Sequence, residues 1–313
     1  TGGAFFIRRS FRGNPLYSIC LKKYVEYLLK NKMNIKVFIE GTRSRTGKML
    51  PPAYGILKMI FEAVANKAVD DVALVPVSLC YDEIPEQGAY SRELSGEQKP
   101  KESAKELLRS TDVVKKKYGK VYIRFGPIQS VKALQQQDIS PTLILQKSAF
   151  QICKTINDIT PITPKAIVST ILLSDPKPTN LERLHRQSHY LQQYALFRKY
   201  PLIIENEEGL RRITEKLLKR LQKSNIVVQN ENSVPREYSC DTNKRILLSI
   251  YRNSAIHCFV NAAVFNLALF SCFKETQRNP SVGNDFQARV LDRMLFIRNL
   301  FKFEFFFSPT KEF

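Results

Sequence analysis

Arginine side chains follow two short apolar runs near the start of the chain. Arg8 and Arg9 come directly after one run, and Arg43 and Arg45 come shortly after the other. A guanidinium group stays charged at physiological pH and binds phosphate oxygens through two parallel hydrogen bonds. The four arginines therefore predict a site for a phosphate or a phosphomonoester. The alternative is a structural cluster of ion pairs at the ends of two strands.

Glu40, Gly41 and Thr42 stand immediately before Arg43. Gly41 permits a tight turn, so the backbone N–H groups of this stretch can donate to the same anion. Glu40 either accepts a hydrogen bond from a substrate hydroxyl or orients Arg43.

Strand and helix patterns alternate through the first half of the chain. This alternation predicts an α/β fold with a mostly parallel sheet flanked by helices, in which ligands bind at the carboxyl ends of the strands. The expected strands span 4–7, 35–39, 72–79 and 121–125, and the expected helices span 16–30, 54–68 and 101–118.

Helical periods dominate the second half, which predicts a helical C-terminal region. We expect two domains, an α/β domain over 1–135 and a helical region over 136–313, divided near the polar stretch 135–140. The expected helices of the second domain span 142–157, 163–173, 179–198, 207–223, 243–273 and 284–305.

The chain has 313 residues and a formal net charge of +20, which should draw it to nucleic acid, anionic lipid or phosphorylated substrates. Residues 1–50 hold eleven Lys and Arg against two Glu, and so carry +9 of this charge. A nucleic-acid-binding protein is a competing hypothesis, but no DNA- or RNA-binding motif is present and it does not explain arginines at strand ends. We therefore expect no nucleic-acid partner.

The cysteines and histidines do not predict a metal site. The six cysteines include no CxxC pair, which favours a reducing compartment and buried thiols. His185 and His189 are four residues apart on an expected helix, but no further Asp, Cys or His stands close by, so a surface pair is expected. His257 lies in an apolar stretch and is expected to be a hydrogen-bonded core residue.

The stretch 255–273 is uncharged over 19 residues, near the ~20 that a helix needs to cross a bilayer. His257, Asn261 and Asn266 would be costly in hydrocarbon, so an ordinary core helix is favoured over a spanning or an interfacial one. The stretch 289–307 mixes Phe, Leu and Ile with Arg and Lys, which also suits a membrane interface.

Three blocks of the sequence resemble the glycerol-phosphate acyltransferase superfamily. They are GAFFIRR at 3–9, FIEGTRSR at 38–45 and VPVSLCYD at 75–82, and they match the family's second, third and fourth motifs in order. Stretches such as YGKVYIRFG at 118–126 and TPITP at 160–164 resemble the bacterial-type glycerol-3-phosphate and dihydroxyacetone-phosphate acyltransferases. The resemblance covers most of the chain and is strongest up to about residue 130.

The resemblance implies transfer of an acyl group from acyl-CoA or acyl-carrier protein to the 1-hydroxyl of glycerol-3-phosphate, in phospholipid biosynthesis. It implies no cofactor, because the thioester is itself a substrate. Pro76 is expected beside the acyl donor. The residues expected to bind the acceptor are Arg8, Arg9, Glu40, Gly41, Thr42, Arg43 and Arg45. A lipid surface at the cytoplasmic face of a membrane is the expected location, since the C-terminal KEF is no peroxisomal signal.

The family's first motif, HxxxxD, is absent from these 313 residues. Its His is the general base and its Asp orients that His. Five residues beyond His185, His189 and His257 stand Tyr190, Tyr194 and Ala262. We expect an N-terminally incomplete chain with no catalytic residue of its own. The alternatives are a dihydroxyacetone-phosphate acyltransferase, or a non-catalytic protein of the same fold that binds anions or a lipid surface.

Overall fold

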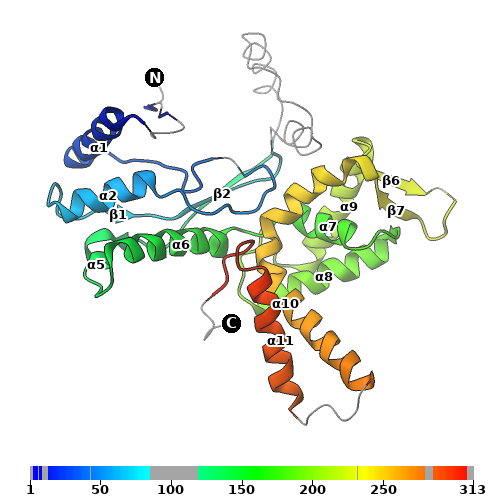
Figure 1. Cartoon of the computed structure of the whole chain (residues 1–313). Helices are drawn as coiled ribbons and strands as arrows, with labels where there is room; N and C mark the ends of the chain where they lie inside the picture. The colour runs from blue at the N-terminus through cyan, green and yellow to red at the C-terminus, as the bar shows by residue number, and fades with distance from the viewer. Residues whose placement is uncertain are drawn as a thin grey trace. The chain divides into compact units, whose positions relative to one another are not determined.

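The computed structural model of the chain is shown in Figure 1. It describes residues 3–5, 7–8, 13–42, 44–84, 119–230, 232–278 and 285–308. Contacts divide the chain into two units, each made of separate stretches of sequence. The first contains 1–42, 51–76 and 127–153, and the second contains 43–50, 77–126 and 154–313. The predicted division into 1–135 and 136–313 stays a prediction.

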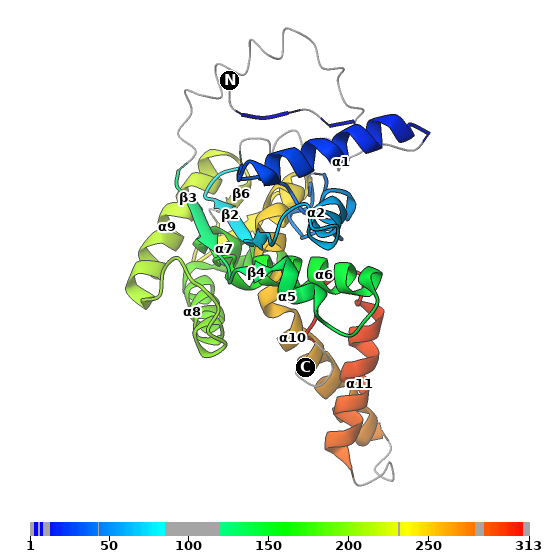
Figure 2. The ribbon, with the colours of Figure 1, turned by 90° about the vertical axis from the view of Figure 1, so that its left-hand side faces the viewer.

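The first unit is built from helices and one short strand pair. Its elements are α1 (Pro15–Lys30), α2 (Gly55–Ala65), β1 (Ala73–Leu74), β4 (Gln129–Ser130), α5 (Val131–Gln135) and the first part of α6 (Pro141–Ile159). α1 lies beside α2 (Figure 2), and Lys22 Nζ of α1 lies 2.6 Å from the Glu62 carboxylate of α2. The apolar face of α2, including Leu57, Ile60 and Phe61, is buried as its helical spacing predicts.

The second unit carries a larger helical core. Its elements are β2 (Val77–Tyr81), β3 (Val121–Phe125), α7 (Pro164–Ser174), β5 (Thr179–Asn180), α8 (Leu181–Phe197), α9 (Glu207–Lys223), β6 (Val227–Asn230), β7 (Glu237–Cys240), a 3₁₀ turn (Thr242–Lys244), α10 (Arg245–Arg278) and α11 (Phe286–Leu300).

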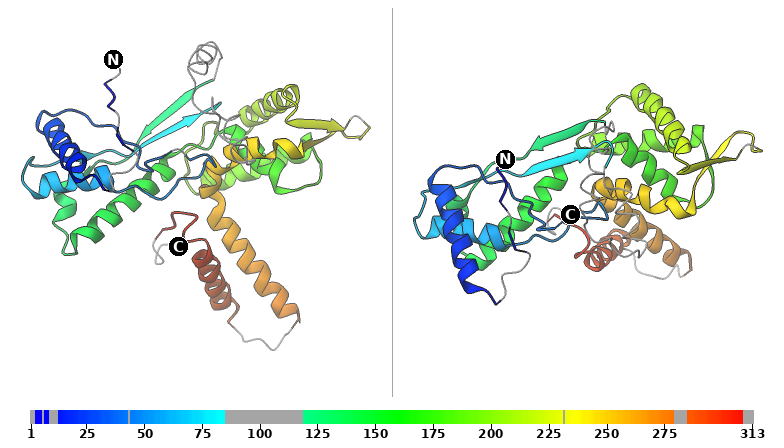
Figure 3. Two further views of the ribbon diagram at one scale, coloured as in Figure 1. Left: turned by 45° about the horizontal axis from the view of Figure 1, so that its top comes forward. Right: turned by 90° about the horizontal axis from the view of Figure 1, so that it is seen from above.

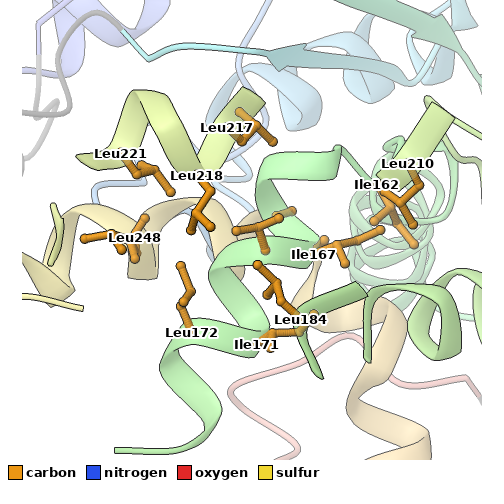
Figure 4. Packing of buried hydrophobic residues seen from close by; sticks show 14 of the residues in the cluster. Ile162, Ile167, Ile171, Leu172, Leu184, Leu210, Leu217, Leu218, Leu221 and Leu248 are labelled. Carbon is orange, nitrogen blue, oxygen red and sulfur yellow. The ribbon is translucent and has the colours of Figure 1, made fainter. Parts of the chain in front are cut away.

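The helix α7 is the centre of this core. Thr163 caps it by accepting from the Ala166 N–H, and nearly all of its residues are buried. Around it pack α8, α9 and α10, and Figure 4 shows Ile167, Ile171 and Leu172 among the leucines of these helices. Each such side chain contributes about 1.5–3 kcal/mol on burial.

The long helix α10 changes environment along its length. Its first half packs against α7, whereas its second half pairs with α11 in a hairpin that Figure 3 shows from two directions. Ala268, Cys272 and Val290 form a small core between the two hairpin helices. The helix is long and apolar enough to cross a membrane. Only 22% of its most apolar stretch is buried inside the protein, which is little for a core helix. The predicted core helix therefore describes the first half of α10 and not the second.

The expected mostly parallel sheet is not shown, and this prediction needs correction. Where the chain is described, β2 pairs with β3, β1 with β4, and β7 with both β5 and β6, all antiparallel. The only parallel pairing among these residues is an isolated bridge between Ile162 and Leu202. Hydrophobic patterns report burial and extension but not the direction of the neighbouring strand, which is why the orientation was wrong.

Two expected strands are not strands in the described residues. The stretch 35–39 runs into a turn, and the described part of 4–7 is irregular. Val37 and Phe38 are exposed, although an apolar run of this kind is typical of a strand that is buried on both faces of a sheet. The small sheet of β5, β6 and β7 was not predicted, and the expected helix 101–118 lies outside the described residues.

The helices of the second half are confirmed closely. The expected spans 163–173 and 207–223 correspond to α7 and α9 within one residue at each end. The structure also confirms His257 as a hydrogen-bonded core residue, because its Nε2–H donates to the Asn157 carbonyl at 2.8 Å. Burial lowers the pKa of the His257 imidazole below its usual value, so the ring is held neutral.

This burial predicts a pH dependence of stability. As the pH falls through about 6.5 an unfolded chain protonates the imidazole more readily than the folded chain, in which the pKa of His257 is lower, so stability is lost as the pH falls. The test measures the free energy of unfolding in urea at pH 7.5 and at pH 5.5. Between these two pH values, the wild type should lose roughly 1 kcal/mol more of this free energy than the variant His257→Gln. An equal loss in both proteins would show that His257 does not contribute to the dependence.

Candidate functional site

The GAFFIRR block is attached to α1 by aromatic contacts. The Phe5 and Tyr24 rings meet edge to face with centroids 5.1 Å apart. The Arg8 backbone N–H donates to the Tyr17 hydroxyl at 3.1 Å, and the Arg8 guanidinium lies 5.1 Å from the centre of the Tyr17 ring. Asn14 caps the helix that carries Tyr17. The start of α1 therefore orders Arg8 while leaving it exposed to solvent.

The turn at Gly41 holds the middle of the FIEGTRSR block. The Gly41 N–H donates to the Phe38 carbonyl at 2.9 Å, and the Ala53 N–H donates to the Ile39 carbonyl at 2.7 Å. Gly41 has a φ of +65°, and a Cβ there would lie 2.7 Å from the Ala53 Cβ. Only glycine suits both constraints. The turn leaves Glu40 half-buried and Thr42 exposed.

Glu40 acts electrostatically on a buried thiol in the same unit. Burial, with a smaller contribution from the Glu40 carboxylate, raises the pKa of Cys153 to about 12. The thiol is therefore neutral at physiological pH. A neutral buried thiol is a poor nucleophile, so Cys153 is a core residue rather than an acyl acceptor.

The second part of the FIEGTRSR block belongs to the other unit. The Asn253 side-chain amide of α10 donates to the Thr46 carbonyl at 2.8 Å, and Lys48 forms an ion pair with Glu304. Gly47, at a φ of +84°, packs directly on the Ile250 carbonyl. These contacts hold the loop that carries the half-buried Arg45 against α10.

The structure thus distributes the predicted site residues over both units. Arg8, Glu40, Gly41, Thr42 and Pro76 belong to the first unit. Arg45 belongs to the second, and Arg9 and Arg43 lie outside the described residues. That they form one acceptor site stays a prediction.

Pro76 directly precedes β2, and its side chain is fully buried. It is therefore a packing residue of the VPVSLCYD block. Its expected place beside the acyl donor also stays a prediction.

A buried network beyond the VPVSLCYD block was not predicted. Lys165 Nζ lies 2.6 Å from the Glu83 carboxylate and 3.8 Å from the centre of the Tyr251 ring. The Tyr251 hydroxyl donates to Glu83 at 3.3 Å and accepts from the Ile84 N–H at 3.1 Å. Burial lowers the pKa of Lys165, and the neighbouring Glu83 opposes this shift. The sequence contains one indication of this network, because Lys165 is the only charged residue in the apolar stretch 161–174.

The remaining histidines pair with carboxylates of α9. His185 Nε2 lies 3.7 Å from Glu215, and His189 Nδ1 lies 3.3 Å from Glu207. Each histidine therefore lies beside a carboxylate of α9, so neither depends on the other histidine as its partner. Within the described ranges, no group of three His, Cys, Asp or Glu could hold a metal ion.

Comparison with known proteins identifies the family. A family model for the glycerol-3-phosphate acyltransferase C-terminal region matches residues 90–313, and a general acyltransferase model matches residues 1–80. The boundary between them falls just after the VPVSLCYD block. The two matches together span almost the whole chain.

Individual relatives agree with the family models. Proteins called putative acyltransferase plsB1 from Mycobacterium tuberculosis and Mycobacterium bovis are 33% identical over 315 residues, which cover 99% of this chain and 50% of theirs. A glycerol-3-phosphate acyltransferase of Pseudomonas putida is 29% identical over 283 residues, covering 84% of this chain and 33% of its own length. The chain spans half or less of the length of these relatives. The family model that matches residues 90–313 covers most of the chain, and on that ground the chain belongs to the glycerol-3-phosphate acyltransferase family.

Proposed function

We propose that the whole protein transfers an acyl group from a thioester, acyl-CoA or acyl-carrier protein, to the 1-hydroxyl of glycerol-3-phosphate. The observation that carries this proposal is the match of residues 90–313 to the family's C-terminal region. The GAFFIRR, FIEGTRSR and VPVSLCYD blocks support it, since they stand in the family's order and all but the last two residues of the third block lie within the match to an acyltransferase model. The product would be a precursor of phospholipids.

The acceptor phosphate is proposed to bind at the arginines of the first two blocks. Arg8 is ordered by Tyr17 and exposed, and Arg9, Arg43 and Arg45 add further guanidinium groups. Glu40, Gly41 and Thr42 complete the site, because the Gly41 turn leaves Thr42 exposed for polar contacts. Hydrogen bonds between charged partners such as these contribute about 1.5–3 kcal/mol each.

The general base is proposed to come from an HxxxxD motif outside these 313 residues. His257 donates to a backbone carbonyl in the core, and His185 and His189 lie against carboxylates of α9. None of them has the environment of a base that approaches a substrate hydroxyl. The base would take the proton of the 1-hydroxyl as its oxygen attacks the thioester carbonyl. The tetrahedral intermediate would then release the thiol, which leaves with that proton.

A lipid surface is the proposed location, at the cytoplasmic face of a membrane. The hairpin of α10 and α11 exposes large apolar side chains, among them Phe270, Phe296 and Leu300. Lysines stand over two exposed rings, Lys274 over Phe270 at 4.6 Å and Lys302 over Phe303 at 5.1 Å. Rings that enter the acyl boundary while neighbouring cations stay at the headgroups are typical of interfacial helices.

The acceptor site is tested by Arg8→Ala in the whole protein. Loss of one guanidinium contact should raise KM for glycerol-3-phosphate by about 10–100-fold and leave KM for the thioester unchanged. Steady-state acyl-transfer rates at varied acceptor concentration give both values. Arg186→Ala removes an exposed arginine of α8 and should change neither constant. An unchanged acceptor KM in the Arg8 variant would remove Arg8 from the site.

Competition between acceptors separates the proposed activity from its alternatives. Dihydroxyacetone phosphate offers the same phosphate and a primary hydroxyl, so it is assayed beside glycerol-3-phosphate at equal concentration. A higher kcat/KM for glycerol-3-phosphate supports the proposal. A higher value for dihydroxyacetone phosphate would assign the other activity, and no transfer to either would leave a non-catalytic protein of this fold.

The hairpin is tested by Phe296→Ser with Phe303→Ser. Removing two exposed rings should weaken binding to vesicles of phosphatidylcholine and phosphatidylglycerol by about tenfold or more, as measured by co-sedimentation. Phe197→Ser is the control, because Phe197 is nearly as exposed as Phe303 but lies on α8. Equal weakening by the control, or none by the double variant, would contradict the assignment.

A further inference from the structure

The helix α9 has two faces of opposite character. Its apolar face, which includes Leu210, Leu217 and Leu221, is buried in the core around α7. At about 100° per residue, five cations on the outside fall within an arc of about 100° and along about 17 Å of the helix. They are Arg212, Lys216, Lys219, Arg220 and Lys223, and all five are exposed.

The charges of this basic face are not neutralised by neighbours. Two carboxylates of α9, Glu215 and Glu207, lie 3.7 and 3.3 Å from His185 and His189 of α8, and these contacts are ion pairs only when the histidines are protonated. Within the part of the chain that the structure describes, none of the five cations forms an ion pair. A row of uncompensated charges attracts a macromolecular anion and speeds its association.

The basic face differs from the lipid-facing hairpin in what it exposes. The described large apolar residues at the surface include several on α10 and α11 but none on α9. An interfacial helix needs apolar side chains that enter the acyl region. The basic face therefore suits a hydrated contact with an acidic protein better than insertion into a membrane.

A hollow beside this face also favours a protein partner. Its volume is about 610 Å³. A hollow of this size can accept several side chains that project from a protein partner, whereas a flat lipid surface has no such projections to fill it. Three isoleucines give it an apolar part, and two of the five cations line it. The lining residues are Ile203, Ile204, Glu205, Asn206, Glu208, Gly209, Arg212, Ile213 and Lys216.

We propose that the basic face of α9 and the adjoining hollow form the docking surface for an acidic carrier protein that delivers the acyl thioester. This inference rests on the proposed function, since it names the partner that brings the donor. CoA carries its negative charge on the phosphates of one nucleotide, whereas an acidic protein spreads its carboxylates over a surface, so the five-cation contact should matter more for a carrier-borne acyl group than for the same group on CoA. The partner's acidic surface would pair with the five cations.

The test is the variant Lys216→Glu with Arg220→Glu in the whole protein. With acyl-carrier protein as donor, KM should rise about tenfold or more, and its dependence on salt between 50 and 300 mM should weaken. With the same acyl group on CoA, KM should stay within twofold of the wild type. Lys67→Glu with Lys147→Glu makes the same change of net charge at exposed positions of the first unit and should leave both constants unchanged.

A direct binding measurement separates failure of this inference from failure of the proposed function. Fluorescence anisotropy of a labelled acyl-carrier protein should show weaker binding to the α9 variant, whether or not acyl transfer occurs. Unchanged binding in a variant that melts at the wild-type temperature would overturn the inference. Weaker binding to anionic vesicles with unchanged carrier binding would also overturn it, by assigning the face to lipid.

Discussion

The burial of α7 is the constraint on which the second unit depends. Its side chains are enclosed by α8, α9 and α10, and these helices bury one face each against it. Lys165 at its start brings a charge into this environment, and the contact with Glu83 and the Tyr251 ring compensates it. Removing one partner of such a pair typically costs 3–5 kcal/mol. The pair therefore couples the end of β2 to the helical core.

The same burial explains why the unit presents two different outer surfaces. α9 buries its leucines and so turns its lysines and arginines to solvent. The second half of α10 keeps exposed apolar side chains, among them Phe265, Phe270 and Phe273, beside the small core that it forms with α11. A charged surface suits an acidic partner and an apolar one suits lipid. An enzyme that transfers a carrier-borne acyl group to a hydroxyl of a soluble phosphomonoester and releases a lipid would use both surfaces.

The sequence predicts α7 and α9 well because each has apolar residues at helical spacing and a side-chain cap at its start. Thr163 before Pro164 and Asn206 before Glu207 begin α7 and α9 where the pattern starts. The strands were predicted less well, since the run at 35–39 is as apolar as a buried strand but is not part of a strand pair in the described residues. At the site, the need for glycine at 41 could be read from the sequence. The buried contact between Glu83 and Lys165 could not, because it joins residues 82 positions apart.

The most direct test of the central claim is the structure of the product made by the protein from its complete reading frame. The protein would be incubated with an acyl thioester and isotopically labelled glycerol-3-phosphate, and the lipid product analysed by mass spectrometry and NMR. The account predicts one new ester, at the 1-oxygen, with the phosphate retained. An ester at the 2-oxygen, or binding of glycerol-3-phosphate and lipid with no ester formed, would contradict it.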